Sequence, residues 1–150
     1  MPERYIEDFV VGQTFGSGRA LVDRERMRTF AAEFDPQPFH LDEEAASKTI
    51  FRGLAASGLY TAALTMRLLV ESEFKPAGGI VGVGLDELRW PLPVRPGDEL
   101  RVETEILEIR PSTSHPRQGQ IKVRTKTLNQ DGKAVQNFVA NLIVPRRPRE

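Results

Sequence analysis

The second half of the chain is organised in runs of residues that suit β-strands, with turn-forming residues between them. Between Ile121 and Thr127, apolar or threonine side chains alternate with lysine and arginine, the period of two expected of a strand with one buried face. The stretch NQDG at residues 129–132 predicts a hairpin. The predicted strands occupy residues 80–90, 99–110, 119–130 and 133–144. Successive hairpins indicate one antiparallel sheet.

Helical spacing replaces this alternation between residues 24 and 34. Asp23 suits the N-cap position, and a proline at position 36 must end the helix because proline disfavours helical backbone at the residue before it. The residues predicted to share one buried face are Met27, Phe30, Ala31 and Phe34.

A second helix is predicted from near Ser57 to about Glu73, roughly 24 Å long at 1.5 Å per residue. Its apolar residues at helical spacing are Leu59, Ala62, Ala63, Met66, Leu69 and Val70. Leu64 and Leu68 are apolar as well, so we expect other structure to enclose this helix. A helix packed against an antiparallel sheet gives an α+β fold class. The basic tail PRRPRE is expected to be frayed.

Composition narrows the function classes. The length of 150 residues and 39% hydrophobic content predict a single domain over residues 1–150. Lysine plus arginine balance aspartate plus glutamate at 21 each, so we expect neither nucleic acid nor membrane as partner. The absence of cysteine excludes disulfides and thiolate chemistry. The N-terminus lacks the apolar core of a signal peptide and no stretch is long enough to span a membrane, so a cytoplasmic location is the expectation.

The stretch FDPQPFHLD at residues 34–42 concentrates the candidate chemistry. Its prolines predict a stiff, irregular connection over Asp35–His40 that holds a carboxylate and an imidazole at fixed geometry. Asp35 could take a proton from water while His40 orients that water or shares the proton. A local reading also exists, in which Asp35 bonds turn amides and His40 bonds backbone groups.

The start of the second helix supplies a possible electrophilic group. The free backbone N–H at Gly58 points forward with the positive end of the helix dipole behind it, and glycine permits close approach of a ligand carbonyl. A base, an imidazole and an N–H donor suit addition or removal of water across the bond between the carbons α and β to a carbonyl, because the N–H can stabilise the enolate oxygen. Loss of such a donor typically costs about 3 kcal/mol of transition-state stabilisation.

Four stretches of the sequence resemble the MaoC-like acyl dehydratases, relatives of the (R)-specific enoyl-CoA hydratases. They are FDPQPFHLDEEAA, FRGLAASGLYTAAL, LDELRWPLPVRPGDEL and NQDGKAV, and the resemblance covers nearly the whole chain. It implies a hotdog fold, in which a curved antiparallel sheet wraps around a long central helix. It also implies a hydratase or dehydratase of fatty acid metabolism that acts on 2-enoyl-CoA and (R)-3-hydroxyacyl-CoA.

The same resemblance implies the site and the assembly. Asp35 and His40 correspond to the catalytic pair and the Gly58 N–H to the oxyanion donor. The neighbouring residues expected to bind substrate are Pro38, Phe39, Ala56 and Ser57. Coenzyme A enters only as part of the substrate, with no separate cofactor and no metal. A homodimer, or a higher assembly of dimers, would hold the acyl-CoA across its interface.

Two positions depart from the family pattern. Ser57 stands where members usually carry histidine, and Ala63 where many carry serine. Both changes alter pocket polarity and leave substrate and rate open. They also keep open a non-catalytic acyl-CoA-binding subunit. A third reading, a hotdog thioesterase, usually needs a helix carboxylate, and here Glu71 and Glu73 lie at the far end of the helix.

Other chemistry-bearing residues have simpler readings. A metal site from Asp35, His40 and Asp42 would lack further histidine or cysteine ligands. Ser57 suits a helix cap better than a nucleophile. The remaining residues favour solvated or packing roles: His115 in a loop, Trp90 in sheet or interface packing, and Lys122, Arg124, Lys126, Arg146 and Arg147 on a strand face and tail rather than on coenzyme A phosphates. For Arg67 two readings stay open: it reaches out of the core along its aliphatic stem, or it meets a carboxylate at an interface.

Overall fold

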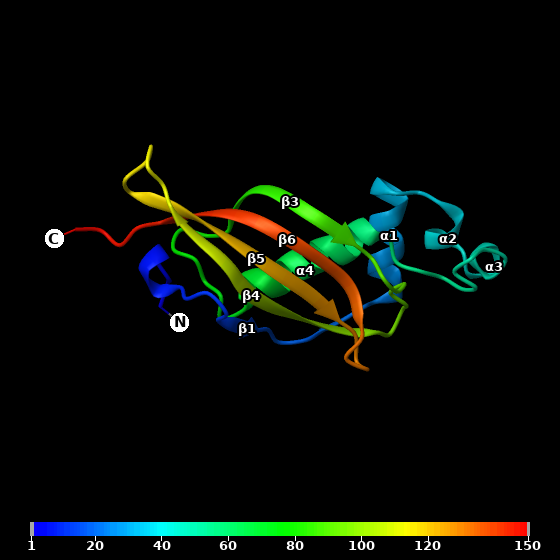
Figure 1. The fold of residues 1–150 in the computed structure, drawn as a ribbon. Coiled ribbons are helices and arrows are strands. Elements are labelled where there is room, and N and C mark those ends of the chain that lie inside the picture. The colour runs from blue at the N-terminus through cyan, green and yellow to red at the C-terminus, as the bar shows by residue number, and fades with distance from the viewer. Residues whose placement is uncertain (1, 150) are drawn as a thin grey trace.

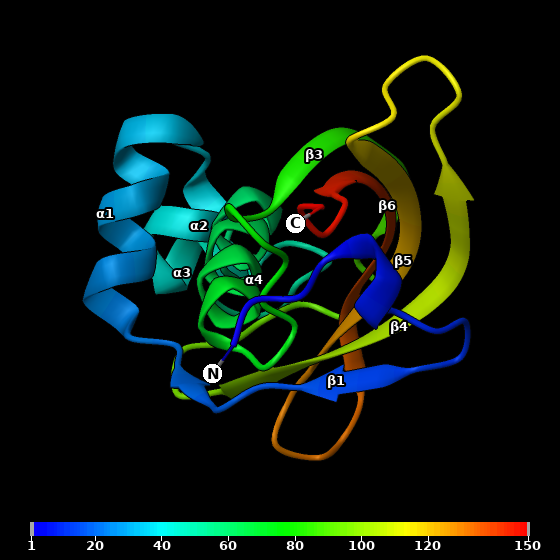
Figure 2. The same cartoon turned by 90° about the vertical axis from the view of Figure 1, so that its left-hand side faces the viewer.

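The computed structural model describes residues 2–149. A six-stranded antiparallel sheet curves around one long helix, α4, as the α+β hotdog prediction requires (Figures 1 and 2). The strands are β1 (Thr14–Gly16), β2 (Ala20–Leu21), β3 (Val81–Arg89), β4 (Glu99–Pro111), β5 (Gln118–Leu128) and β6 (Ala134–Pro145). The helices are η1 (Ile6–Asp8), α1 (Arg24–Phe34), α2 (Pro38–Leu41), α3 (Glu43–Ser47) and α4 (Gly58–Glu71). The order across the sheet is β1-β4-β5-β6-β3, and β2 also pairs with β4.

The alternation that predicted the sheet reappears as burial along β5. Ile121, Val123 and Thr125 are buried, while Lys122 and Arg124 between them remain partly exposed. The predicted hairpin closes between β5 and β6, where the N–H of residue 132 donates to the carbonyl of residue 129 at 3.0 Å. The four long strands therefore confirm the sequence prediction, whereas β1 and β2 are too short to show a period.

The buried face of α4 differs from the predicted one. The side chains buried against the sheet are Thr61, Leu64, Thr65, Leu68 and Leu69. Leu59, Met66 and Val70 are 52%, 45% and 50% exposed, so the prediction of an enclosed helix is wrong for a single chain. The sheet covers one side of α4 only, and the pattern of apolar residues could not distinguish that side from the other.

The segment that leads to the site is more regular than expected. Asp23 caps α1 by accepting from the Arg26 N–H at 2.9 Å, and α1 ends before Pro36 as predicted. His40, however, lies in α2, a single helical turn, because proline is well suited to the first helical position. Phe34 is 60% exposed rather than buried, since it lies at the end of α1 where no strand covers it.

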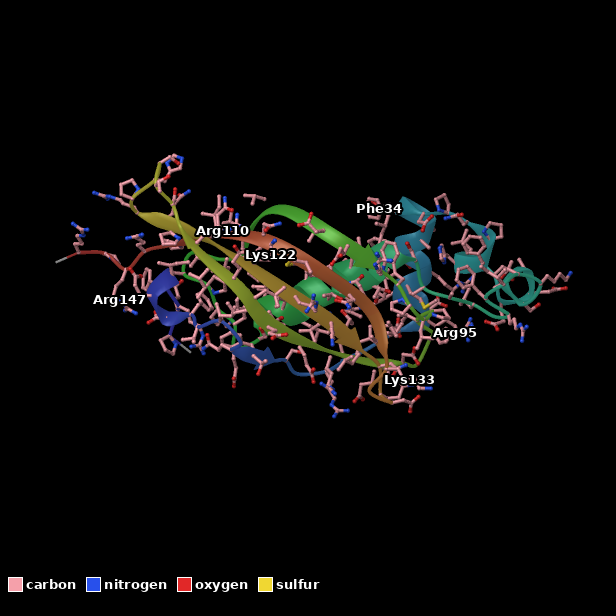
Figure 3. All side chains as sticks on the ribbon, in the orientation of Figure 1. Phe34, Arg95, Arg110, Lys122, Lys133 and Arg147 are labelled. Carbon is pink, nitrogen blue, oxygen red and sulfur yellow. The ribbon has the colours of Figure 1, made fainter. Side chains whose placement is uncertain are left out.

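Charged side chains lie at both ends of the molecule (Figure 3). Figure 3 shows Phe34 and Arg95 at the end that carries α1, and Arg110, Lys122 and Arg147 toward the opposite end. The start of the C-terminal tail is held rather than frayed, because the Arg147 N–H donates to Glu7 Oε1 at 2.8 Å.

Within residues 2–149, no helix combines the length and apolarity needed to cross a bilayer.

Candidate active site

A cavity of about 450 Å³ opens at the N-terminal end of α4. Asp35, His40 and Gly58 are among the residues that line it, and most of the others are apolar. The remaining lining residues are Ile50, Phe51, Ala56, Leu59, Thr61, Trp90, Pro91, Leu92, Pro93 and Val94. This arrangement brings the three predicted catalytic residues to one concave surface.

Asp35 directly follows α1, and both of its carboxylate oxygens are occupied. Ser57 Oγ donates to Oδ2 at 2.7 Å, and Gln37 Nε2 donates to Oδ1 at 2.5 Å. The Ser57 hydrogen bond is the main cause that lowers the pKa of Asp35, against a burial effect that raises it, with Gln37 and His40 lowering it further. Asp35 is therefore held as a carboxylate, the form that can accept a proton.

His40 is 5% exposed and is fixed through both ring nitrogens. Nδ1 lies 2.7 Å from the carbonyl oxygen of Ala55, which can only accept, so Nδ1 carries a hydrogen. Nε2 lies 3.2 Å from Asp35 Oδ2, which is also an acceptor when ionised. The contact is a hydrogen bond when Nε2 carries a hydrogen and donates it to Oδ2.

Ser57 and Gly58 form the start of α4. Ser57 is the N-cap, because its Oγ accepts from the Leu59 N–H at 3.2 Å, and the Tyr60 N–H donates to the Ser57 carbonyl at 3.0 Å. Gly58 is the first helical residue, so its N–H has no intrahelical acceptor, and no hydrogen bond from it is found within residues 2–149. This N–H is the unpaired donor on the cavity wall.

Two contacts that sequence reasoning missed hold the cavity walls. The guanidinium of Arg95 donates to the carbonyls of Phe51, Gly53 and Leu54, the last two at 2.8 and 3.2 Å. This clamp fixes the loop that brings Phe51 to the cavity. The ring of Trp90 packs on Gly58 so closely that a Cβ added at Gly58 would lie 2.6 Å from it. Trp90 and Arg95 both lie in the stretch RWPLPVRPGD at residues 89–98. The hydrogen-bond partners of their side chains lie 41 to 46 residues away, so no local pattern could reveal these contacts.

Of the four residues predicted to bind substrate, the structure places one on the cavity surface and three outside its lining. Ala56 lines the cavity, and Ser57 is fully buried behind Asp35. Pro38 is exposed, and Phe39 packs edge-on against the His40 ring at 4.6 Å between centroids. In the described part of the chain, neither Pro38 nor Phe39 belongs to the cavity wall. Their expected contact with substrate therefore stays a prediction, and the structure shows Phe39 in contact with the His40 ring.

The side chains considered for other roles are hydrogen-bonded, paired or exposed in the structure. Asp42 caps α3 by accepting from the Ala45 N–H at 3.1 Å, and no cluster of three metal-ligating side chains occurs among residues 2–149. His115 is exposed in the loop between β4 and β5. Arg67 lies 3.7 Å from Glu71 at the far end of α4, and Lys122 lies 3.8 Å from Glu108 on the sheet.

Comparison with known proteins adds a family to this geometry. A sequence model of the MaoC like domain matches residues 8–129. The structure of the MaoC-like dehydratase from Rhodospirillum rubrum has a TM-score of 0.94 and 53% identity, covering 97% of this chain and 99% of that one. An uncharacterized protein of Bacillus subtilis strain 168 is 36% identical over 93% of this chain and 96% of its own length. The 3-hydroxybutyryl-CoA dehydratase of Methylorubrum extorquens is 32% identical over 75% of this chain and 70% of its own.

The family match spans most of the chain, and the fold agrees over nearly its full length with a solved relative. The cavity with Asp35, His40 and Gly58 also lies within the matched residues. The chain therefore belongs to the MaoC-like dehydratase family, on the hotdog fold.

Proposed function

We propose that the protein adds water to 2-enoyl-CoA thioesters and removes it from (R)-3-hydroxyacyl-CoA thioesters, a reaction of fatty acid metabolism. The observation that carries this proposal is the contact of 3.2 Å between Asp35 Oδ2 and His40 Nε2, on a cavity wall shared with the unpaired Gly58 N–H. Membership of a dehydratase family, and a relative that is a 3-hydroxybutyryl-CoA dehydratase, support the same reaction class.

Each proton in the hydration step has a donor and an acceptor. Asp35 accepts a proton from water while the water oxygen forms a bond to C3 of the enoyl group. The electron pair of the C2–C3 double bond shifts, giving an enolate whose oxygen accepts a hydrogen bond from the Gly58 N–H. His40 Nε2–H then protonates C2, and the proton on Asp35 returns to His40 across their contact. The net change is OH on C3 and H on C2, and dehydration is the reverse.

The same cavity disfavours thioester hydrolysis. Asp35 is the one acidic residue on its wall among the residues described, and it lies outside α4. Glu71, an acid on α4, ends the helix at the far side and lies beside Arg67. The non-catalytic reading gives the Asp35–His40 pair no chemical role, although Ser57 and Gln37 both donate to the Asp35 carboxylate and fix its orientation beside His40.

The acting unit is a homodimer. β3 pairs with β6 on one edge and exposes Val81, Val83 and Leu85, while α4 exposes Met66 and Val70. Pairing two copies through β3 satisfies backbone groups that are otherwise an aggregation hazard, and it covers apolar surface. The substitution Leu85→Lys is expected to shift the sedimentation coefficient from dimer to monomer, whereas Val10→Lys, at an exposed apolar residue of the N-terminal loop, is not.

Incubation with crotonyl-CoA tests the reaction. The proposal expects loss of the enoyl absorbance without release of free thiol, and chromatography on a chiral phase after hydrolysis is expected to yield (R)-3-hydroxybutyrate. Release of thiol at the same rate as enoyl loss would indicate a thioesterase. Tight binding of crotonyl-CoA with no loss of absorbance would indicate the binding subunit.

A further inference from the structure

A chain of buried polar side chains runs from the core of the fold to the cavity. Gln136, on β6, is 0% exposed. Its Oε1 accepts from Trp90 Nε1 at 2.9 Å, and its Nε2 donates to Thr65 Oγ1 at 3.0 Å. Thr65 Oγ1 lies 2.7 Å from Thr127 Oγ1. Four side chains from three elements and the segment after β3 are thus linked, and the chain ends at the indole of Trp90.

Such a network needs a reason to exist inside an apolar core. A buried amide is costly unless both of its ends are paired, and apolar residues of the same shape could fill the space without that risk. The network reaches the cavity wall only through Trp90. Its distinguishing effect is therefore to fix the position of that indole.

Trp90 stands directly beside the expected oxyanion donor. The closest ring atom lies 2.6 Å from the position a Cβ would take on Gly58, so the ring contacts that glycine. Trp90 is nevertheless 45% exposed and lines the cavity, which means that part of its surface faces space rather than protein. An acyl chain whose carbonyl sits at the Gly58 N–H meets this ring as the chain extends into the cavity.

We propose that Trp90 sets the length of the acyl group that the cavity accepts, and that Gln136 is the positioning residue that holds Trp90 in place. This inference rests on the proposed function for its turnover readout but not for its binding readout. Aromatic side chains carry a large rigid surface, so a pinned indole forms a wall that does not yield to a longer chain. Leu92 and Ile50 complete the apolar lining.

The binding readout uses the chain's only tryptophan, which is Trp90 itself. Saturated butyryl-, hexanoyl-, octanoyl- and decanoyl-CoA are titrated into the intact protein, with affinity from calorimetry and emission excited selectively at the indole. We expect a blue shift of the emission that grows with chain length and then stops at the length where affinity stops rising. Binding of all four with no change of emission overturns the proposal, as does absence of binding.

The turnover readout compares variants on 2-enoyl-CoA substrates of the same four lengths. Trp90→Ala is expected to extend the preferred length by at least two methylene groups, an increase of about fifteenfold in kcat/KM for the longer substrate relative to the shorter, at about fourfold per methylene. Gln136→Leu keeps the indole but frees it, so a smaller increase in the same direction is expected. Parallel length profiles of wild type and both variants would overturn the proposal.

A matched control separates positioning from stability. Thr125 is also fully buried, and its Oγ1 lies 3.1 Å from Thr104 Oγ1, in a second polar pair that does not contact the cavity. Thr125→Val is expected to change melting temperature but not the length profile. Should Trp90→Ala fail to fold, Trp90→Phe and the wild-type emission titration carry the test. If the protein hydrates no substrate, the proposed reaction fails while the emission titration still decides the role of Trp90.

Discussion

The two ends of α4 are built from similar parts that are used differently. A buried serine lies at each end, Ser57 at the start and Ser72 at the end, and each accepts from the backbone N–H two residues further on at 3.2 Å. Ser72 Oγ donates to the Leu69 carbonyl at 2.6 Å, inside the same helix. Ser57 Oγ instead donates to the Asp35 carboxylate, 22 residues earlier in the sequence.

The surroundings complete the contrast. Beyond Ser72, Phe74 is 0% exposed and its ring packs at 5.5 and 5.6 Å from those of Phe9 and Phe15. That end of the helix is closed by apolar packing. The Ser57 end leaves the Gly58 N–H and the Asp35–His40 pair on a cavity. Both ends hold buried polar groups, but only the Ser57 end has polar groups on a cavity, and the proposed function is assigned to that end for this reason.

The largest effect is expected at His40. His40→Gln removes the Nε2 proton that reaches C2, and a loss of crotonyl-CoA hydration of about 10²–10⁴-fold is expected, the range for a general acid–base group. The other histidine, His115, is exposed on a loop, so His115→Gln serves as the control and is expected to keep full activity. Equal rates for both variants would remove His40 from the chemistry.

Gly58→Ala should rank next. The added Cβ would lie 2.6 Å from the Trp90 ring, so either the ring or the helix start must shift, and stability should fall by about 1–3 kcal/mol, as for overpacked cores. Hydration should fall about 100-fold because the N–H donor moves with the backbone. Gly16→Ala, with no atom within 4 Å of the added Cβ, should change neither quantity. Denaturant melts and initial rates measure both.

Part of the candidate site could be predicted from the sequence because it depends on residues close together in the chain. The spacing D-x-x-P-x-H predicted that Asp35 and His40 lie close together, because two of the four residues between them are prolines and leave the backbone little freedom. Ser57 as a cap and the four long strands followed from local pattern. The catalytic roles of Asp35 and His40 remain predictions that only measurements of activity can test.

The features that the sequence did not predict share a physical cause: each depends on how elements distant in the sequence pack together. Trp90 meets Gln136 only because β3 pairs with β6 with a register shift between Asp86 and Arg89, and no local period encodes that shift. Arg95 reaches the carbonyls before α4 across 41 to 44 residues. The buried face of α4 was likewise decided by which side the sheet covers.

Measuring Ser57→Ala beside Ser72→Ala tests whether the two ends of α4 differ in function. Both lose a hydroxyl that accepts from the backbone, so each should lose about 0.5–2 kcal/mol of stability, as at helix caps. Ser57→Ala alone should also lose about tenfold in hydration, since a hydrogen bond to a charged group contributes about 1.5–3 kcal/mol. Similar rates for both variants would mean that the two helix ends do not differ in function.

The smallest effect is a shift of the acid limb of the pH–rate profile. The pKa of Asp35 is lowered chiefly by the Ser57 hydrogen bond, so its carboxylate stabilises the fold above its unfolded pKa of about 3.9, and that contribution is lost as pH falls through the lowered pKa. In Ser57→Ala the pKa of Asp35 should rise. The acid limb of kcat/KM should therefore move to higher pH, and an unmoved limb would assign it to another group.

Hydration of crotonyl-CoA by Asp35→Asn, measured beside its affinity for the same compound, tests the central claim most directly. Asparagine keeps the size of the side chain and can still accept from Ser57 Oγ, but it cannot take a proton from water. The expected result is wild-type affinity with hydration lowered about 10²–10⁴-fold. Wild-type turnover by this variant would contradict the assignment of Asp35 as the base.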